Sequence, residues 1–396
     1  MFTGFKKMAA LAGLAGGLGG FWMPVWAAAP TADSVPLLAQ AETNAPQATS
    51  PESAPVRMAL LLPNRGGMFG AAADAVRSGV LAAYSRQKEN IQLVVVETGD
   101  SVPDMQRAYD DASAKFDILI GPLSRSAVTS VIQSGRVAKP TIALAQPDLP
   151  GEAEAQLPPM MLTVGLSIDD EARQVANWVE KEKAPGKIFA ISTAVAWQKR
   201  AVRSFQARAR QLGLQVDTLE LSTPGNALSA PGLAQLAKRI EQEKPALIFA
   251  ALDAGQAVQL RSAVGTELPF YGTSQINPFT LNRDNPNDKI PELDGVKLID
   301  LPWQLEPDNV AVARYPHPAG NDGDRPNPDL ARLYALGIDA YRIAYGISRQ
   351  QSGFDLDGVT GRLNVNMARG GSTYFQRQET QAVYQDGLPV PTADQY

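Results

Sequence analysis

The sequence predicts an α/β protein of two lobes, each with a parallel β-sheet, and three observations support this. The chain has 396 residues, more than a single hydrophobic core usually serves. From residue 56 onward, short apolar runs alternate with longer amphipathic stretches, which is the pattern of βαβ units. This alternation runs once to about residue 146 and begins again near residue 167, so we expect two sheets.

The first series begins with a continuous apolar run from Met58 to Leu62, as expected for a strand buried on both faces. After it, Ala72, Val76 and Val80 recur at helical spacing. The expected strands of this series are 58–62, 91–98, 116–123 and 140–146, and the expected helices are 71–84, 102–114 and 125–138.

The second series starts with a helix signal, because Ser167 stands three residues before Asp170 at the head of an amphipathic stretch. Apolar runs and amphipathic stretches then alternate as before. The expected strands are 187–193, 214–221, 246–253 and 270–275, and the expected helices are 169–182, 196–212, 231–243 and 255–264.

The last hundred residues depart from this alternation. A strand is expected at 295–303, and the most strongly periodic helix of the chain at 329–347. The segments 358–366 and 381–390 alternate apolar with polar residues, so we expect them to form an antiparallel pair.

The N-terminus is typical of an export signal. Two lysines precede an apolar, uncharged stretch at 8–25, and small residues follow it, so residues 1–27 are expected to be a signal peptide cleaved before Ala28. The alternative is an uncleaved membrane anchor, since about 18 apolar residues can just span a bilayer.

Residues 28–55 are rich in Ala, Pro, Ser, Thr and Glu and poor in aromatic residues, so they are expected to be a disordered linker. The whole chain lacks cysteine, which excludes disulfides, thiolate catalysis, cysteine-bound metals and a lipid-attachment cysteine. The net charge of -5 and scattered basic residues argue against nucleic-acid binding.

The glycine-rich loop "NRGGMFG" after the first strand is not a phosphate-binding loop. A Walker loop needs Gly-Lys-Ser or Gly-Lys-Thr, and no lysine follows here. A dinucleotide fingerprint needs a glycine where Arg65 stands, before Gly67 and Gly70. The loop does leave the carboxyl end of a parallel strand, where α/β sheets bind ligands.

No catalytic or metal-binding constellation is found. His317 is the only histidine and lies between prolines, where a solvated loop residue is the favoured interpretation over a member of a catalytic triad. The run Asp169-Asp170-Glu171 is explained by the helix dipole at a helix start. We therefore expect no catalytic residues, no metal and no cofactor, and a protein that is not an enzyme.

Several local motifs resemble the LppC family of penicillin-binding-protein activators, within the type I periplasmic binding proteins. The more specific matches are "GPLSRSAV", "ALGIDAY" and "GVTGRL". The others are "MALLLPNRGGMFGAAADAVRSGVLAAY", "PTIALAQ", "GLSIDDEARQVANW", "YGTSQI" and "DLPW", and the matches follow the family's order from residue 58 to about 390.

The resemblance implies two Rossmann-like lobes in a Venus-flytrap architecture, joined by three crossovers and closing on a cleft. We expect lobe one to comprise 56–164 and 299–355, and lobe two to comprise 165–298 and 356–396. Familiar members of the family are outer-membrane lipoproteins with a helical-repeat domain before this part, and in place of both this chain has the linker.

The resemblance implies a non-enzymatic periplasmic regulator that stimulates a class A penicillin-binding protein during peptidoglycan synthesis by protein contact. The alternative is a periplasmic solute receptor that closes on an amino acid or similar small polar ligand and delivers it to a transporter. In either case we expect a periplasmic protein that touches the membrane only through an uncleaved N-terminus.

The candidate cleft residues follow from the strand ends. In a receptor, Arg125 would bind the ligand's carboxylate and Asp253 its ammonium group. The simpler alternative is that Arg125 pairs with its own helix surface and Asp253 caps the next helix. The full candidate set is Met68, Phe69, Ser124, Arg125, Gln146, Asp253, Ser274, Gln275 and Trp303.

Overall fold

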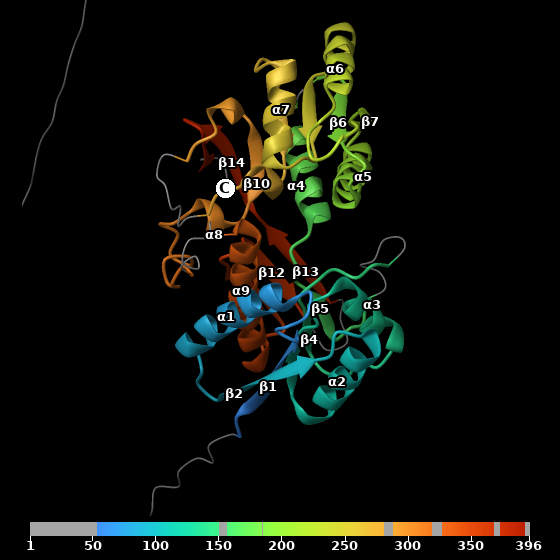
Figure 1. The fold of residues 1–396 in the computed structure, drawn as a ribbon. Helices are drawn as coiled ribbons and strands as arrows, with labels where there is room; N and C mark the ends of the chain where they lie inside the picture. Colours follow the sequence, from blue (N-terminus) through green and yellow to red (C-terminus); the bar gives the residue numbers. More distant parts are fainter. Residues whose placement is uncertain are drawn as a thin grey trace, which may run out of the picture. The chain divides into compact units, whose positions relative to one another are not determined.

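The computed structural model describes residues 54–149, 157–183, 185–280, 288–318, 327–367 and 373–392 (Figure 1). The predicted signal peptide, and the predicted linker except for its last two residues, lie outside these ranges. Within them the strands form three sheets of five, seven and three strands. Among the described helices, none combines the length and apolar character needed to cross a bilayer.

The first sheet is entirely parallel and has the order β2-β1-β3-β4-β5. Four of its strands form where the apolar runs predicted them, although β3 and β4 are shorter than expected, and the fifth strand, β5, was not predicted. Their bounds are Val56–Pro63 (β1), Ile91–Thr98 (β2), Ile118–Ile120 (β3), Thr141–Ala143 (β4) and Met161–Thr163 (β5).

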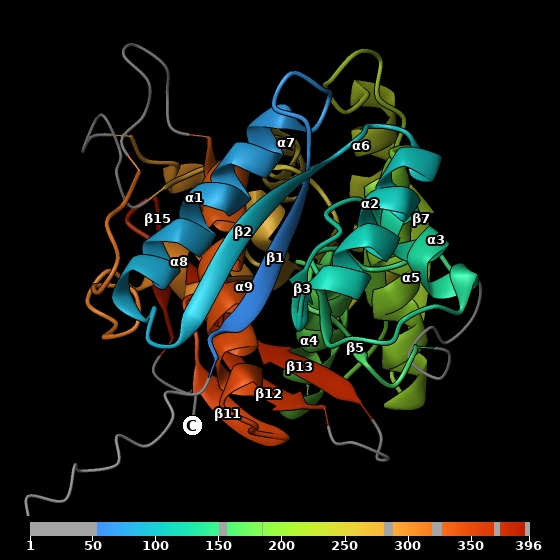
Figure 2. The ribbon, with the colours of Figure 1, turned by 90° about the horizontal axis from the view of Figure 1, so that it is seen from below.

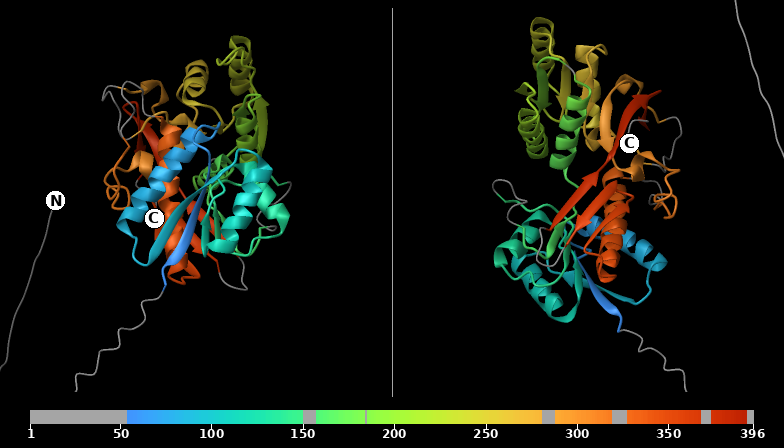
Figure 3. Two further views of the ribbon diagram at one scale, coloured as in Figure 1. Left: turned by 60° about the horizontal axis from the view of Figure 1, so that its bottom comes forward. Right: turned by 180° about the vertical axis from the view of Figure 1, so that it is seen from behind.

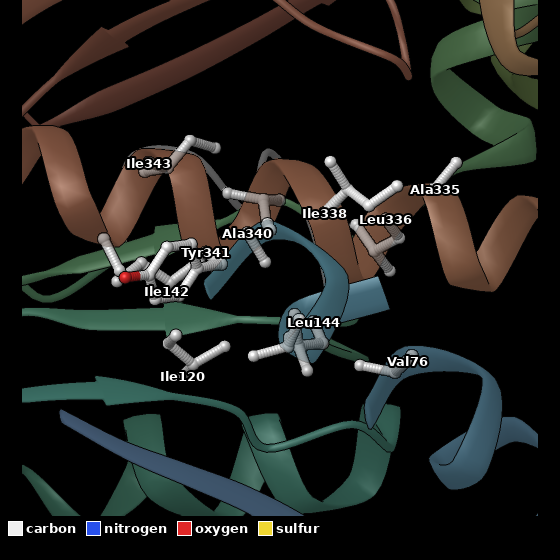
Figure 4. Close-up of a cluster of buried hydrophobic side chains, with 14 of the residues drawn as sticks. Val76, Ile120, Ile142, Leu144, Ala335, Leu336, Ile338, Ala340, Tyr341 and Ile343 are labelled. Atoms are coloured by element: carbon white, nitrogen blue, oxygen red, sulfur yellow. The ribbon is translucent and has the colours of Figure 1, made fainter. Parts of the chain in front are cut away.

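Helices cover both faces of this sheet. They are α1 (Gly70–Arg86) and α9 (Pro328–Ser348) on one face, with α2 (Val102–Lys115) and α3 (Arg125–Ser134) on the other. Side chains of β1 point alternately to the two faces of the sheet. Met58 and Leu60 pack toward α1 and α9, whereas Ala59 and Leu61 pack toward α2 and α3. Figure 4 shows side chains of the first of these cores, with α9 lying along the strands.

Helix α3 ends four residues earlier than the apolar pattern predicted. Gly135 adopts φ of 64°, a left-handed conformation that stops the helix and that glycine adopts without steric cost. Val137, which extended the helical pattern, lies in the loop beyond the helix. Its side chain packs against the core on this face of the sheet.

The second sheet has the order β15-β14-β10-β9-β8-β6-β7, in which the five strands β6 to β10 are parallel and β14 and β15 are antiparallel. Its strands are β6 (Ile188–Ser192), β7 (Val216–Glu220), β8 (Leu247–Ala250), β9 (Phe270–Gly272), β10 (Lys297–Asp300), β14 (Thr380–Gln385) and β15 (Leu388–Pro391). Helices α4 (Ile168–Lys181) and α5 (Ala196–Gln211) contribute to one core, and α6 (Ala230–Glu243) and α7 (Ala254–Val264) to the other. The predicted capping residue Ser167 is confirmed, since its Oγ accepts the Asp170 N–H at 3.2 Å.

The third sheet corrects the expected pairing of the C-terminal segments. Strands β11 (Gly353–Asp357), β12 (Arg362–Asn366) and β13 (Tyr374–Gln378) form one antiparallel sheet. The segments 358–366 and 381–390 therefore do not pair with each other: β12 pairs with β11 and β13, and β14 pairs with β15 and β10. Alternating polarity marks both as half-buried strands but does not say which strand is the neighbour.

The third sheet also changes the expected division into lobes. Leu363 and Val365 of β12 lie in the core of the first sheet together with α9, so the segment from 356 to 378 packs there and not with the second sheet. At the other boundary, residues 299 and 300 belong to β10 of the second sheet. We use first lobe for the elements around the five-stranded sheet, with β11–β13, and second lobe for those around the seven-stranded sheet.

The chain passes between the lobes three times, as the resemblance implied: from β5 to α4, from β10 through α8 (Pro302–Leu305) to α9, and from β13 to β14. The last passage is direct, because only Glu379 separates the two strands. The right panel of Figure 3 shows the red C-terminal strands running from the first lobe toward the second lobe.

Candidate functional site

Two of the predicted site residues of the first lobe, Ser124 and Arg125, are engaged within that lobe. Ser124 caps α3, and its Oγ accepts the Ala127 N–H at 3.3 Å. Arg125 Nη2 donates to the Pro147 carbonyl oxygen at 3.3 Å and lies 3.7 Å from Asp148 Oδ1. The guanidinium of Arg125 thus pairs with a loop of its own lobe, and not with the surface of its own helix as the simpler interpretation predicted.

Gln146 and Asp253 also have local partners. The Gln146 amide donates to the carbonyl oxygens of Thr163 and Gly165, at 3.3 and 3.5 Å, and so fastens the start of the first crossover. Asp253 caps α7, with its Oδ1 accepting the Gln256 N–H at 2.8 Å. Within the described residues, Asp253 makes no contact with Arg125 that would form a clamp for an amino acid.

The remaining candidates divide between buried and exposed positions. Trp303 is 1% exposed and packs against His317 and Tyr334, with ring centroids 4.2 and 5.3 Å apart. Ser274 is buried, and Gln275 beside it is half-buried.

Among the candidate residues, the two of the glycine-rich loop are the ones that present large apolar side chains to solvent. Met68 is 89% exposed and Phe69 is 40% exposed. The loop is therefore an accessible apolar projection beside the carboxyl end of β1.

A buried ionic cluster joins the two lobes and was not predicted. Arg332 of α9 donates from Nη2 to Asp300 Oδ2 at 2.7 Å and from Nε to Asp300 Oδ1 at 3.0 Å. The same Nη2 donates to the carbonyl oxygens of Ser274 and Asn277, both at 3.0 Å. Arg332 is 5% exposed and Asp300 fully buried, so this pair fixes α9 against the ends of β9 and β10.

Two glutamates border this cluster. Glu171 of α4 accepts the N–H and the hydroxyl of Ser274, at 2.8 and 3.0 Å. Burial raises the pKa of Glu171 to about 7, with the charge of Asp300 acting in the same direction and the bonds from Ser274 and the charge of Arg332 opposing it. Burial also raises the pKa of Glu379, and the charge of Glu171 adds to the effect.

The pKa of Glu171 predicts a measurable pH dependence of stability. The folded state retains the Glu171 proton up to about pH 7, whereas the unfolded chain loses it near its ordinary pKa of 4.5. Because the folded state then binds more protons, the free energy of unfolding should fall as pH rises from 4.5 to 7, by on the order of 3 kcal/mol.

Glu171→Gln tests this, because a glutamine has the shape and hydrogen-bonding capacity of the protonated acid. Urea unfolding should give a free energy that falls less steeply over this pH range in the variant than in the natural protein. If the free energy of unfolding falls equally steeply with pH in both proteins, Glu171 does not have a raised pKa in the folded state.

The third crossover is also bonded to the first. Arg377 at the end of β13 donates to the carbonyl oxygens of Val164 and Gly165, at 2.7 and 3.3 Å. The Glu379 N–H donates to Gln174 Oε1 at 3.0 Å. The third crossover is thereby fastened to the first crossover and to α4.

The motifs "ALGIDAY" and "GVTGRL" meet in space. Asp339 is 1% exposed, and its carboxylate accepts the N–H groups of Val359 and Thr360, at 3.1 and 2.7 Å, and the Thr360 hydroxyl at 2.7 Å. A Cβ at Gly358 would lie 2.6 Å from Asp339 Oδ2, so glycine permits this approach. The two motifs together attach the third sheet to α9.

The sequence contained a signal for these polar contacts that the strand-end reasoning did not use. Arg332 and Asp339 lie seven residues apart on the most apolar helix of the chain. Charged residues on a helix face that is otherwise buried need specific partners, because burying an unpaired charge is costly. Within the described residues, no group of three or more His, Asp or Glu side chains is arranged to hold a metal ion.

Comparison with known proteins identifies the family. A family profile with the description "LppC putative lipoprotein" matches residues 49–387. This chain belongs to the LppC family. The match covers both lobes, and the two-lobed fold is that of the periplasmic binding proteins.

The LppC chain is similar to penicillin-binding protein activators named LpoA. The one from Pasteurella multocida is 22% identical over 345 residues, which cover 84% of this chain and 54% of the relative. The LppC chain thus spans about half the length of the curated relatives it matches.

Two solved structures share the fold of the LppC chain. The C-domain of LpoA from Haemophilus influenzae, described as a regulator of PBP1A, has a TM-score of 0.66 and 21% identity, with coverage of 85% of this chain and all of that domain. A protein from Chromobacterium violaceum, described as "a putative branched-chain amino acid ABC transporter", has a TM-score of 0.65 and 32% identity. The match covers 83% of this chain and 100% of that protein's chain.

Proposed function

We propose that this LppC protein is a non-enzymatic periplasmic regulator that stimulates a class A penicillin-binding protein by direct contact. The observation that carries the proposal is that the chain covers the whole C-domain of a PBP1A regulator and belongs to the same family as the LpoA activators. The engagement of Arg125 and Asp253 within their own lobes also supports a protein-contact role over a solute clamp.

Export is part of the same proposal. The predicted signal peptide would deliver residues 28–396 to the periplasm, where the synthase domains work. The chain holds no cysteine to which a lipid could be attached, so we propose a protein that is released or held by its N-terminal segment.

We propose that the glycine-rich loop contributes to the contact. Met68 and Phe69 are exposed, and Met and aromatic residues are enriched where protein interfaces bury their central side chains. Docking would favour the active state of the synthase if that state binds the loop more tightly than the inactive state does.

The test combines binding and activity. The processed chain is used to capture a class A penicillin-binding protein from detergent-solubilised envelope, and the purified pair is then assayed for peptidoglycan synthesis. Replacing Met68 and Phe69 by Ser should lower stimulation at least tenfold, as the loss of two central contacts costs about 2 kcal/mol or more.

The matched control is Val310→Ser, which changes a valine that is 66% exposed and lies apart in sequence from the loop. Its stimulation should equal that of the natural protein. Unchanged stimulation by the loop variant would remove the loop from the proposal, and failure to bind or stimulate any class A synthase would overturn the proposed function.

A solute receptor is the second candidate, and the 32% identity to the Chromobacterium violaceum protein favours it. Thermal unfolding in the presence of individual amino acids distinguishes the two. A ligand present at 100 times its Kd stabilises the folded state by about 2.7 kcal/mol and would raise Tm. Such a shift, together with no effect on a synthase, would establish the receptor.

A further inference from the structure

Strand β2 has an outer edge with which none of the other described strands pairs. It forms the border of the five-stranded sheet and pairs with β1 in unbroken register from Ile91 to Thr98 (Figure 2). Natural proteins usually protect such an edge with charged side chains, above all lysine, or with a proline, a bulge or a very short strand. The eight residues of β2 contain no lysine, proline or bulge, and their one charged residue is Glu97, near the carboxyl end of the strand.

Exposed large hydrophobic side chains are frequent in the part of the chain that contains β2. Ten large hydrophobic side chains of the described residues are exposed, and six of them lie between residues 68 and 102, on β2 and the elements beside it. Helix α1 runs along the strand, since Tyr84 donates to the Ile91 carbonyl oxygen. The six are Met68, Phe69, Leu81, Val94, Val95 and Val102.

We propose that the β2 edge pairs antiparallel with β2 of a second copy of this chain, and that the two copies share a continuous ten-stranded sheet. A two-fold axis normal to the sheet keeps both α1 helices on the same face. Two residues that stand opposite each other in the two β2 strands then point to the same face of the shared sheet, as regular strand pairing requires. Pairing centred on Val94 places Leu93 against Val95 and Gln92 against Val96, which covers the exposed valines.

The charges at the two ends of β2 match in this arrangement. Lys88 and Glu89 precede the strand, and Asp100 follows it; all three are exposed. Antiparallel pairing brings Lys88 of one copy beside Asp100 of the other. A partner that presented like charges at these ends would be repelled, so the pattern favours a second copy of the same chain.

Sedimentation velocity of the processed chain at low salt tests the pairing. The natural protein should sediment as a dimer at micromolar concentration and dissociate on dilution. The double substitution Val94→Lys and Val95→Lys should give a monomer with an unchanged circular dichroism spectrum and Tm. The matched control is Val390→Lys, a valine 38% exposed on β15 at the border of the other sheet, and this variant should remain a dimer.

Charge reversal tests the orientation. Lys88→Asp and Asp100→Lys should each weaken the dimer roughly tenfold, because each reversal acts at two symmetric contacts. The variant that carries both reversals should recover the natural affinity. A monomer at all concentrations, or a dimer that survives Val94→Lys with Val95→Lys, would overturn the proposal. No synthase is present in these experiments, so their outcome is independent of the proposed function.

Discussion

Replacing Arg332 by Met is expected to lower the free energy of unfolding by about 3–5 kcal/mol. Arg332 and Asp300 are both buried, and the guanidinium supplies two hydrogen bonds to that carboxylate and two to carbonyl oxygens of the second lobe. Without Arg332, the Asp300 charge stays in a low-dielectric interior with only its bonds from Asn277 and from the Leu301 N–H.

Urea unfolding of three variants measures this effect. Arg173→Met, which removes an exposed ion pair with Asp170 on α4, should cost less than about 1 kcal/mol. The double variant Arg332→Met with Asp300→Leu should be more stable than Arg332→Met alone, since no charge is left unpaired. Equal costs for Arg332→Met and Arg173→Met would show that the buried pair does not hold the lobes together.

Replacing Gly337 by Ala is expected to lower the free energy of unfolding by about 2 kcal/mol or more. A Cβ at this position would lie 2.2 Å from the Val76 carbonyl oxygen of α1, and Gly79 of α1 faces the backbone of Tyr334 in the same way. Helices α1 and α9 therefore meet backbone to backbone, and neither main chain can move aside without disturbing the sheet beneath them.

The matched control is Gly255→Ala, because Gly255 is also helical and its added Cβ would meet only Asp253 Oδ1, at 3.5 Å. Its stability should be unchanged or raised by up to about 1 kcal/mol, since alanine favours a helix. Chemical unfolding of both variants gives the comparison. A Gly337→Ala protein as stable as Gly255→Ala would contradict the close helix contact.

The local elements of this protein were predictable because their signals are local. Continuous apolar runs mark β1 and β8 as strands buried on both faces, and both are buried throughout most of their length. Ser167 has a side chain suited to a helix start and caps α4 as predicted. The caps at Ser124 and Asp253 show the same rule at positions that were also proposed as ligand contacts.

The site was less predictable because it depends on neighbours distant in sequence. Ser274 was placed correctly at a strand end, but its partner Glu171 lies 103 residues away. Trp303 lies on the second crossover, near which it was expected, and its ring is enclosed by His317 and Tyr334. A strand-end rule indicates where polar side chains gather but not which of them are already paired.

The sequence by itself determined the α/β class, the number of lobes and most strand and helix positions, because hydrophobic periodicity and capping act within a few residues. Only the tertiary structure decided that β12 and β13 join the first lobe. Alternating polarity gives a strand one apolar face but does not determine which strands it pairs with. Only the tertiary structure decided that Arg332 and Asp300 meet across the lobes, because a buried charge is stabilised by whichever opposite charge the fold brings to it.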